Sequence, residues 1–274
     1  MKSVFVINDN SVEARSVAEA ALMFAKSINA GLLIGSKVIR SESVELSLVS
    51  GTEDDEHHID EHLFHYLNVL NQYTEGDETL IREVDITDLD SSSVASFINQ
   101  NNITMVMVPA DHELTSNAMA KQLDLQVVLN KISVPMLVLP ANWSYKSIQR
   151  LTYITDLRWC RTDVLGYLSK LTHPNKTELF IGHVAASGIP DMSTDFAKQV
   201  FFEVAKGCGN YERLNFHHIK SNDIATVADV LVHAMKNDAL VLINHSQHYS
   251  YFIGKKLSLN QPQLINVPLL LYPN

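Results

Sequence analysis

The chain has 274 residues, of which 46% are hydrophobic and 19% are charged, and its net charge is −10. This length favours two domains, the composition excludes a disordered chain, and no apolar run reaches the roughly 18 residues of a membrane span, so we expect a cytoplasmic protein. Residues 1–141 carry a net charge of −13 and residues 142–274 a net charge of +3, so the acidic first half argues against a nucleic-acid partner, which clustered Lys and Arg would bind.

Short apolar runs alternate with amphipathic stretches along residues 1–141. The runs predict strands at 3–8, 31–39, 79–84, 103–108 and 134–139. Apolar residues at helical spacing predict four helices between them, the first of which follows the cap candidate Ser11. Strands that alternate with helices favour a parallel sheet covered on both faces.

The same order recurs in residues 142–274. The predicted strands are near 150–155, 178–184, 213–218, 239–243 and 267–272. FVINDN at 5–10 aligns with TYITDL at 152–157, which places Asp9 over Asp156, and VPMLVLP at 134–140 recurs as VPLLLYP at 267–273. We therefore predict two doubly wound α/β domains, 1–141 and 142–274, each with a five-stranded parallel sheet.

Each copy resembles a universal stress protein domain, through the aspartate after its first strand, its length and its final VP strand. The tandem copy is similar to the two-domain members of that family. The resemblance implies an adenine nucleotide alpha hydrolase-like fold with strand order 3-2-1-4-5. It also implies a nucleotide crevice between the ends of strands 1 and 4, which is where open α/β sheets generally bind ligands.

The predicted ligand-facing residues lie at the ends of those strands and in the segment after strand 4. Asp9 and Asp156 are the candidate carboxylates of the two crevices. The remaining candidates for binding a ligand are all in the second domain: Asn244, His245, Ser246, Gly254, Lys255 and Ser258.

Family members that bind ATP carry a glycine-rich pattern after strand 4, and this chain departs from it. No glycine occurs between Gly76 and Gly166, so the first domain has no residue suited to the tight phosphate loop, and we expect no family-type ATP binding there. The second domain retains Gly254, followed by Lys255 and Ser258. The ligand stays open, with ATP or AMP as candidates for the second domain.

Two further patterns each have a functional and a structural interpretation. His58, His62 and His65 share one stripe of a predicted acidic helix, where they form either a metal site or a solvated surface. Cys160 lies between Arg158 and Arg161, which would lower the pKa of a redox-sensing thiol, or it is an ordinary cysteine at a helix start. We predict neither a catalytic residue set nor a metal ligand set.

We expect a non-enzymatic protein that acts in stress response or ligand sensing. The alternatives are a nucleotide-dependent enzyme and an interaction protein that docks partners through its acidic half. The strands at 134–139 and 267–272 are apolar edge strands, and such edges need a partner. We predict that they pair, with Val138 close to Leu271, so that the domains form a pseudo-dimer within the chain; further dimerisation stays open.

Overall fold

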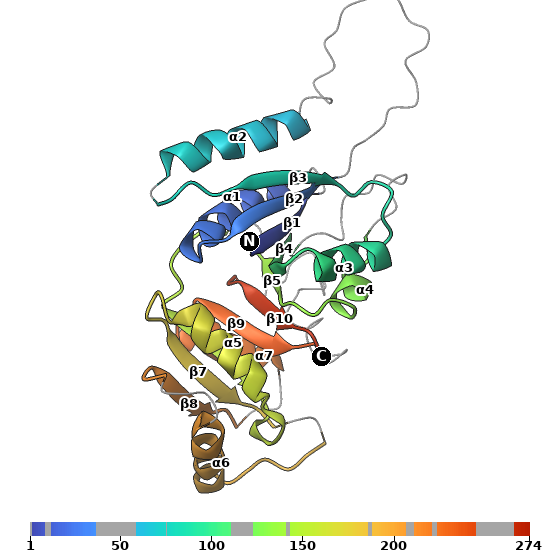
Figure 1. Cartoon of the computed structure of the whole chain (residues 1–274). Helices are drawn as coiled ribbons and strands as arrows, with labels where there is room; N and C mark the ends of the chain where they lie inside the picture. The colour runs from blue at the N-terminus through green and yellow to red at the C-terminus, as the bar shows by residue number, and fades with distance from the viewer. Residues whose placement is uncertain are drawn as a thin grey trace, which may run out of the picture. The chain divides into compact units, whose positions relative to one another are not determined.

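The computed structural model describes residues 2–8, 12–36, 59–74, 76–110, 123–140, 143–185, 188–206, 211–220, 224–244 and 266–274. Contacts divide the chain into two compact units, which we call the first unit (Met1–Val134) and the second unit (Pro135–Asn274). Strands and helices alternate along both (Figure 1). The predicted α/β class is confirmed.

The first unit contains a parallel sheet in the order β3-β2-β1-β4. Its strands are β1 (Ser3–Asn8), β2 (Gly31–Ser36), β3 (Ile81–Asp85) and β4 (Ile103–Pro109). Its helices are α1 (Val12–Ser27), α2 (Ile59–Tyr73), α3 (Ser91–Gln100) and α4 (Leu125–Leu129). The sheet order reverses at β1, so right-handed crossovers place α1 and α2, which pack against each other, on one face and α3 and α4, which also pack together, on the other.

Helix α1 shows why the sequence folds this way. Besides Ala20, the residues that it buries recur at helical spacing: Ala14, Val17, Ala18, Ala21, Leu22 and Ala25. Most of these side chains are alanines, which let the helix backbone approach β1 and β4 closely. The short helix α4 is fixed at its start by Asp124, whose Oδ1 accepts from the amides of Gln126 at 2.9 Å and Val127 at 3.1 Å.

The second unit repeats this architecture. Its strands are β5 (Met136–Leu139), β6 (Arg150–Thr155), β7 (Glu178–His183), β8 (Leu214–His218), β9 (Ala239–Ile243) and β10 (Leu269–Tyr272). Its helices are the 3₁₀ turn η2 (Leu157–Trp159), α5 (Thr162–Thr172), α6 (Thr194–Lys206), α7 (Ile224–Asp229) and the π-helical turn η3 (Val230–Ala234). The parallel strands lie in the order β8-β7-β6-β9-β10.

Strand β5 pairs antiparallel with β10, with Val138 opposite Leu269 and Met136 opposite Leu271. The two proline-bracketed runs of the sequence therefore meet, as predicted. This pairing explains why contacts divide the chain before β5, whereas the sequence repeat divides it after residue 141.

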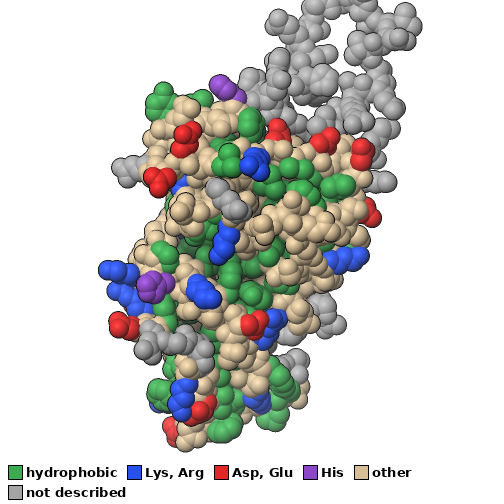
Figure 2. Space-filling model, viewed as in Figure 1, with side chains coloured by type: hydrophobic (Ala, Val, Ile, Leu, Met, Phe, Trp, Pro, Cys, Tyr) green, Lys and Arg blue, Asp and Glu red, His purple; other side chains and the backbone are tan. Residues whose placement is uncertain are grey.

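Side chains of different kinds are mixed on the surface. Figure 2 shows acidic, basic and apolar side chains interspersed on the face in view, without a large patch of one charge sign among the coloured residues. Within the ranges given above, every helix is too short or too polar to cross a lipid bilayer.

Candidate functional site

Polar side chains gather at the carboxyl ends of three neighbouring strands in the second unit. Asp156 follows β6 directly, His183 is the last residue of β7 and His218 is the last residue of β8. Because the strands are parallel, these ends lie at one edge of the sheet. Asp191 joins them from the segment between β7 and α6.

The strand register brings the two histidines together. His183 and His218 are Cα partners in the β7–β8 ladder, so their side chains leave the same face of the sheet. Their ring centroids are 5.1 Å apart. His217 leaves the opposite face, where its ring stacks on Phe180 at 4.8 Å.

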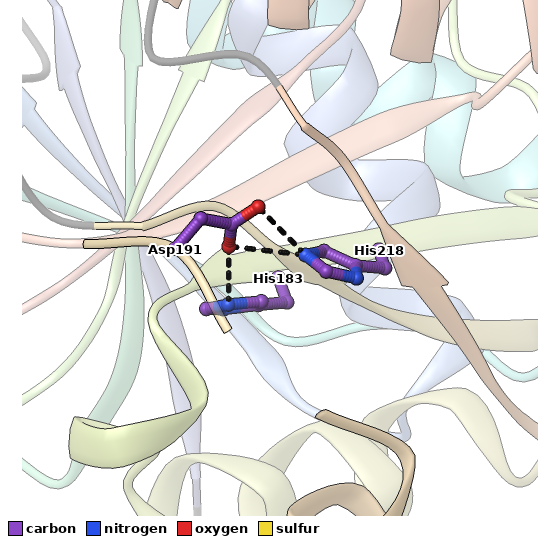
Figure 3. Close-up of side chains that lie close together, drawn as sticks. All are labelled: His183, Asp191 and His218. Atoms are coloured by element: carbon purple, nitrogen blue, oxygen red, sulfur yellow. Dashed lines mark hydrogen bonds and ion pairs between the residues drawn. The ribbon is translucent and has the colours of Figure 1, made fainter. Parts of the chain in front are cut away.

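Asp191 bridges the two imidazoles (Figure 3). Both of its carboxylate oxygens lie 3.0 Å from Nε2 of His218, and Oδ1 lies 3.4 Å from Nε2 of His183. The His183 side chain is fully buried and that of His218 is 5% exposed, whereas that of Asp191 is 33% exposed. We call His183, Asp191 and His218 the histidine–aspartate cluster; it is buried on the histidine side and open to solvent on the aspartate side.

The tautomer of His183 follows from its neighbours. The amide of Leu157 donates to Nδ1 at 3.2 Å, so the proton of the neutral ring is on Nε2, which faces Asp191. Burial lowers the pKa of His183 below its ordinary value, although the charge of Asp156, with Oδ1 3.9 Å from Nδ1, opposes this shift. The ring is therefore neutral at physiological pH.

Asp191 remains ionised beside these rings. Burial by itself would raise its pKa, but the hydrogen bonds from His218 and from the Met192 amide at 2.8 Å hold the pKa below its ordinary value. The cluster thus combines one carboxylate with a neutral buried imidazole.

Asp156 is held inside the protein by Arg158. Its Oδ2 is 2.5 Å from Nη2 of Arg158, and its Oδ1 accepts from Nε at 2.8 Å and from the Arg158 amide at 3.1 Å. The last contact caps the turn η2. Arg158 also donates through Nη1 to the carbonyl of Pro190 at 3.0 Å, close to Asp191 in the chain. A ligand that uses the Asp156 carboxylate must therefore compete with a fork-shaped ion pair.

The predicted crevice lies between the ends of β6 and β9. Asp156 and Asn244 follow these paired strands, and both residues are buried. The amide of Asn244 donates to the carbonyl of Tyr272 at 2.7 Å, which fixes the end of β9 beside β10. The other predicted ligand residues lie outside the described residues: Asp9, His245, Ser246, Gly254, Lys255 and Ser258.

The two subsidiary patterns are only partly described. His65 is exposed on α2, whereas His58 and the side chain of His62 lie outside the described residues. Cys160 is half-buried. Of the arginines beside it, Arg158 is paired with Asp156, and Arg161 is paired with Asp163 at 2.6 Å.

Sequence reasoning did not identify the histidine–aspartate cluster. Its only sequence signal is a histidine at the end of each of two predicted strands, His183 in IGHV and His218 in NFHHI. Asp191 lies in a connecting segment without a recognisable pattern, so nothing in the sequence connects it with the histidines.

Comparison with known proteins relates this fold to others. No protein-family model and no curated protein matches the sequence. A universal stress protein from Archaeoglobus fulgidus DSM 4304 is similar in structure, with a TM-score of 0.58 and 14% identity over 99% of this chain and 96% of that chain. A functionally unknown protein from Pseudomonas aeruginosa PAO1 has a TM-score of 0.55 and 10% identity over 100% of this chain and 92% of that one.

A putative universal stress protein from Pseudomonas aeruginosa UCBPP-PA14 is also similar, with a TM-score of 0.53 and 11% identity over 100% of this chain and 93% of its own length. At these identities the likeness concerns the fold alone. The chain therefore has the α/β fold seen in solved universal stress proteins.

Proposed function

We propose that the protein is a non-enzymatic ligand-sensing protein of the stress-response type, which binds a small anionic ligand, with ATP or AMP as the candidates, in the second unit. The observation that carries this proposal is the reversal of strand order at β6, which has β7 on one side and β9 on the other. The segments that follow β6 and β9 run to opposite sides of this point, and the crevice between these segments is the usual ligand site of an open α/β sheet.

The residues at this crevice suit a nucleotide-sized polar ligand. Asp156 and Asn244 supply a carboxylate and an amide at the ends of the two strands. Arg158 brings a positive charge to the same edge, and its side chain is 27% exposed. The hydrogen bonds to Asp156 and Pro190 use three of the five N–H groups of the guanidinium, so the other two can contact an anion.

The likeness in fold agrees with this proposal but cannot carry it, because one fold hosts many functions. The sequence adds Gly254, Lys255 and Ser258 as residues for a phosphate group, in the segment after β9. In this proposal the first unit has no family-type ATP site, since its corresponding segment has no glycine.

Thermal-shift titrations of the full chain with ATP, with AMP and with inorganic phosphate test the proposal. A ligand that binds only the folded state raises the melting temperature as its concentration exceeds its dissociation constant. We expect a rise with a nucleotide that is lost in Lys255→Ala and kept in Lys198→Ala, which removes the same charge from an exposed position of α6. No rise in melting temperature with any of the three ligands would refute the proposal. If inorganic phosphate raised the melting temperature as much as the nucleotides do, the site would bind anions without recognising a nucleotide.

A turnover assay separates sensing from catalysis. The full chain is incubated with ATP, and the release of phosphate is compared with that of a sample without protein. We expect equal rates. A faster rate that is lost in Lys255→Ala would replace the sensing proposal with the nucleotide-dependent enzyme.

A further inference from the structure

We propose that the histidine–aspartate cluster is a binding site for a divalent transition-metal ion such as Zn²⁺, with His183 Nε2, His218 Nε2 and an Asp191 carboxylate oxygen as ligands and water in the remaining position. Two imidazoles and one carboxylate, with one open position, are a ligand set that proteins use for zinc and for other transition metals. The proposal does not require a bound nucleotide, because its three ligands come from β7, β8 and the segment before α6.

The spacing of the three candidate ligand atoms fits one shared ion. Ligand bonds of about 2.0–2.2 Å in a tetrahedral zinc site place neighbouring ligand atoms roughly 3.3–3.6 Å apart. Asp191 Oδ1 is 3.4 Å from His183 Nε2, and it is 3.0 Å from His218 Nε2. All three atoms lie within 4.8 Å of one another. The two aspartate–histidine distances are thus close to those of a shared ion, and binding has to bring all three pairs into this range.

Burial supplies a second, independent indication of a ligand. Nε2 of the fully buried His183 makes no hydrogen bond within the described residues, and it points toward Asp191, whose Oδ1 lies 3.4 Å away (Figure 3). Buried polar atoms are normally satisfied, so an unsatisfied nitrogen beside a carboxylate requires an explanation. A metal ion that takes the place of the proton on this nitrogen satisfies it.

The charges of the surroundings favour a cation. Asp156 and Asp191 bring two negative charges to this edge of the sheet, and Arg158 neutralises one of them. Metal ions bind the neutral imidazole and the ionised carboxylate, and the hydrogen bond from the Leu157 amide to Nδ1 fits a neutral His183. The partly exposed Asp191 side leaves access for an ion and for a water ligand.

Metal binding displaces the Nε2 protons of both histidines, since His218 Nε2 donates to Asp191, and at His183 it also requires a local rearrangement. Nδ1 now accepts from the Leu157 amide, so the proton is on Nε2. When a metal takes Nε2, the proton moves to Nδ1, and Asp156 Oδ1, now 3.9 Å away, must come closer to accept it. The Leu157 amide must then give up its hydrogen bond. Its NMR resonance therefore reports on metal at this cluster and not on metal bound elsewhere.

Calorimetric titration of the EDTA-treated full chain with Zn²⁺ tests the site, and Co²⁺ absorption in the visible range reports its coordination. Asp191→Asn keeps the shape of the side chain and removes its charge. We expect its Zn²⁺ affinity to fall by at least about tenfold, with loss of the Co²⁺ spectrum and of the Leu157 shift. His218→Ala should have the same effect.

Two control variants address competing sites. Asp229→Asn makes the same change in an exposed His–Asp contact, where Asp229 lies 4.0 Å from His233. His65→Ala removes the described member of the histidine-rich stripe on α2. Both should bind Zn²⁺ like the wild type. Absence of Zn²⁺ and Co²⁺ binding in the wild type would overturn the proposal, and so would wild-type affinity in Asp191→Asn with an unchanged circular dichroism spectrum.

Discussion

The guanidinium of Arg158 forms a bidentate ion pair with the carboxylate of Asp156, with Nη2–Oδ2 at 2.5 Å and Nε–Oδ1 at 2.8 Å. The aspartate lies between two features of the second unit. It follows β6 directly, at the predicted ligand crevice, and its Oδ1 is 3.9 Å from Nδ1 of His183 in the histidine–aspartate cluster. The ion pair therefore couples the charge of the crevice to the charge around the cluster.

Arg158→Ala should destabilise the protein by about 2–3 kcal/mol, because it leaves the buried Asp156 carboxylate without its cation. Lys206→Ala is the matched control: it breaks an ion pair with Glu203 in which both side chains are about 70% exposed, and its effect should be below about 0.5 kcal/mol. Urea denaturation measures both. Equal effects would show that the Asp156–Arg158 pair contributes no more than a surface ion pair.

Two glycine-to-alanine changes should have opposite effects on stability. A Cβ at Gly35 would lie 2.6 Å from Cζ of the fully buried Phe5, so Gly35→Ala should cost about 1–3 kcal/mol through overpacking. A Cβ at Gly166, inside α5, would meet nothing within 4 Å, so Gly166→Ala should stabilise by about 0.5–1 kcal/mol through helix propensity. Melting temperatures of the two variants decide this, and a loss of stability in Gly166→Ala would contradict the open space at that position.

The sequence predicted the fold well because the fold depends on local periodicity. Apolar runs and helical stripes predicted alternating strands and helices, and the repeated apolar edge runs predicted the pairing of β5 with β10. The candidate site was less accessible. Asp156 was identified by its position after a strand, but its partner Arg158 reaches it only through the turn η2. Asp191 lies in the segment between β7 and α6, and no local sequence pattern predicts that this segment brings it next to His183.

The buried hydroxyl of Tyr153 should make the protein less stable at alkaline pH. Burial raises the pKa of Tyr153 far above its ordinary value of about 10, and the charge of Cys160 adds to this shift. Above pH ~10 the unfolded tyrosine loses its proton while the folded one keeps it, so the free energy of unfolding falls as the pH rises.

Tyr153→Phe removes this titration and should flatten the loss of stability between about pH 10 and pH 12. Tyr73→Phe is the control, since that side chain is 84% exposed. Urea denaturation across this pH range measures the slope for both variants. An unchanged slope in Tyr153→Phe would show that other groups account for the alkaline loss.

Cysteines placed across the β5–β10 pair should form a disulfide in one register only. Val138 and Leu269 are Cα partners, and such partners lie about 4.5–5.5 Å apart, within the range of a disulfide. Val138 and Leu271 are diagonal neighbours, roughly 7–8 Å apart, beyond the usual reach of that bond. The pairs Val138→Cys/Leu269→Cys and Val138→Cys/Leu271→Cys are introduced after Cys160→Ser and Cys208→Ser. We expect mild oxidation to shift the mobility of the first pair on a denaturing gel, and reduction to restore it. Cross-linking of the diagonal pair alone would show a different register, and cross-linking of neither would show that the two proline-bracketed runs do not meet.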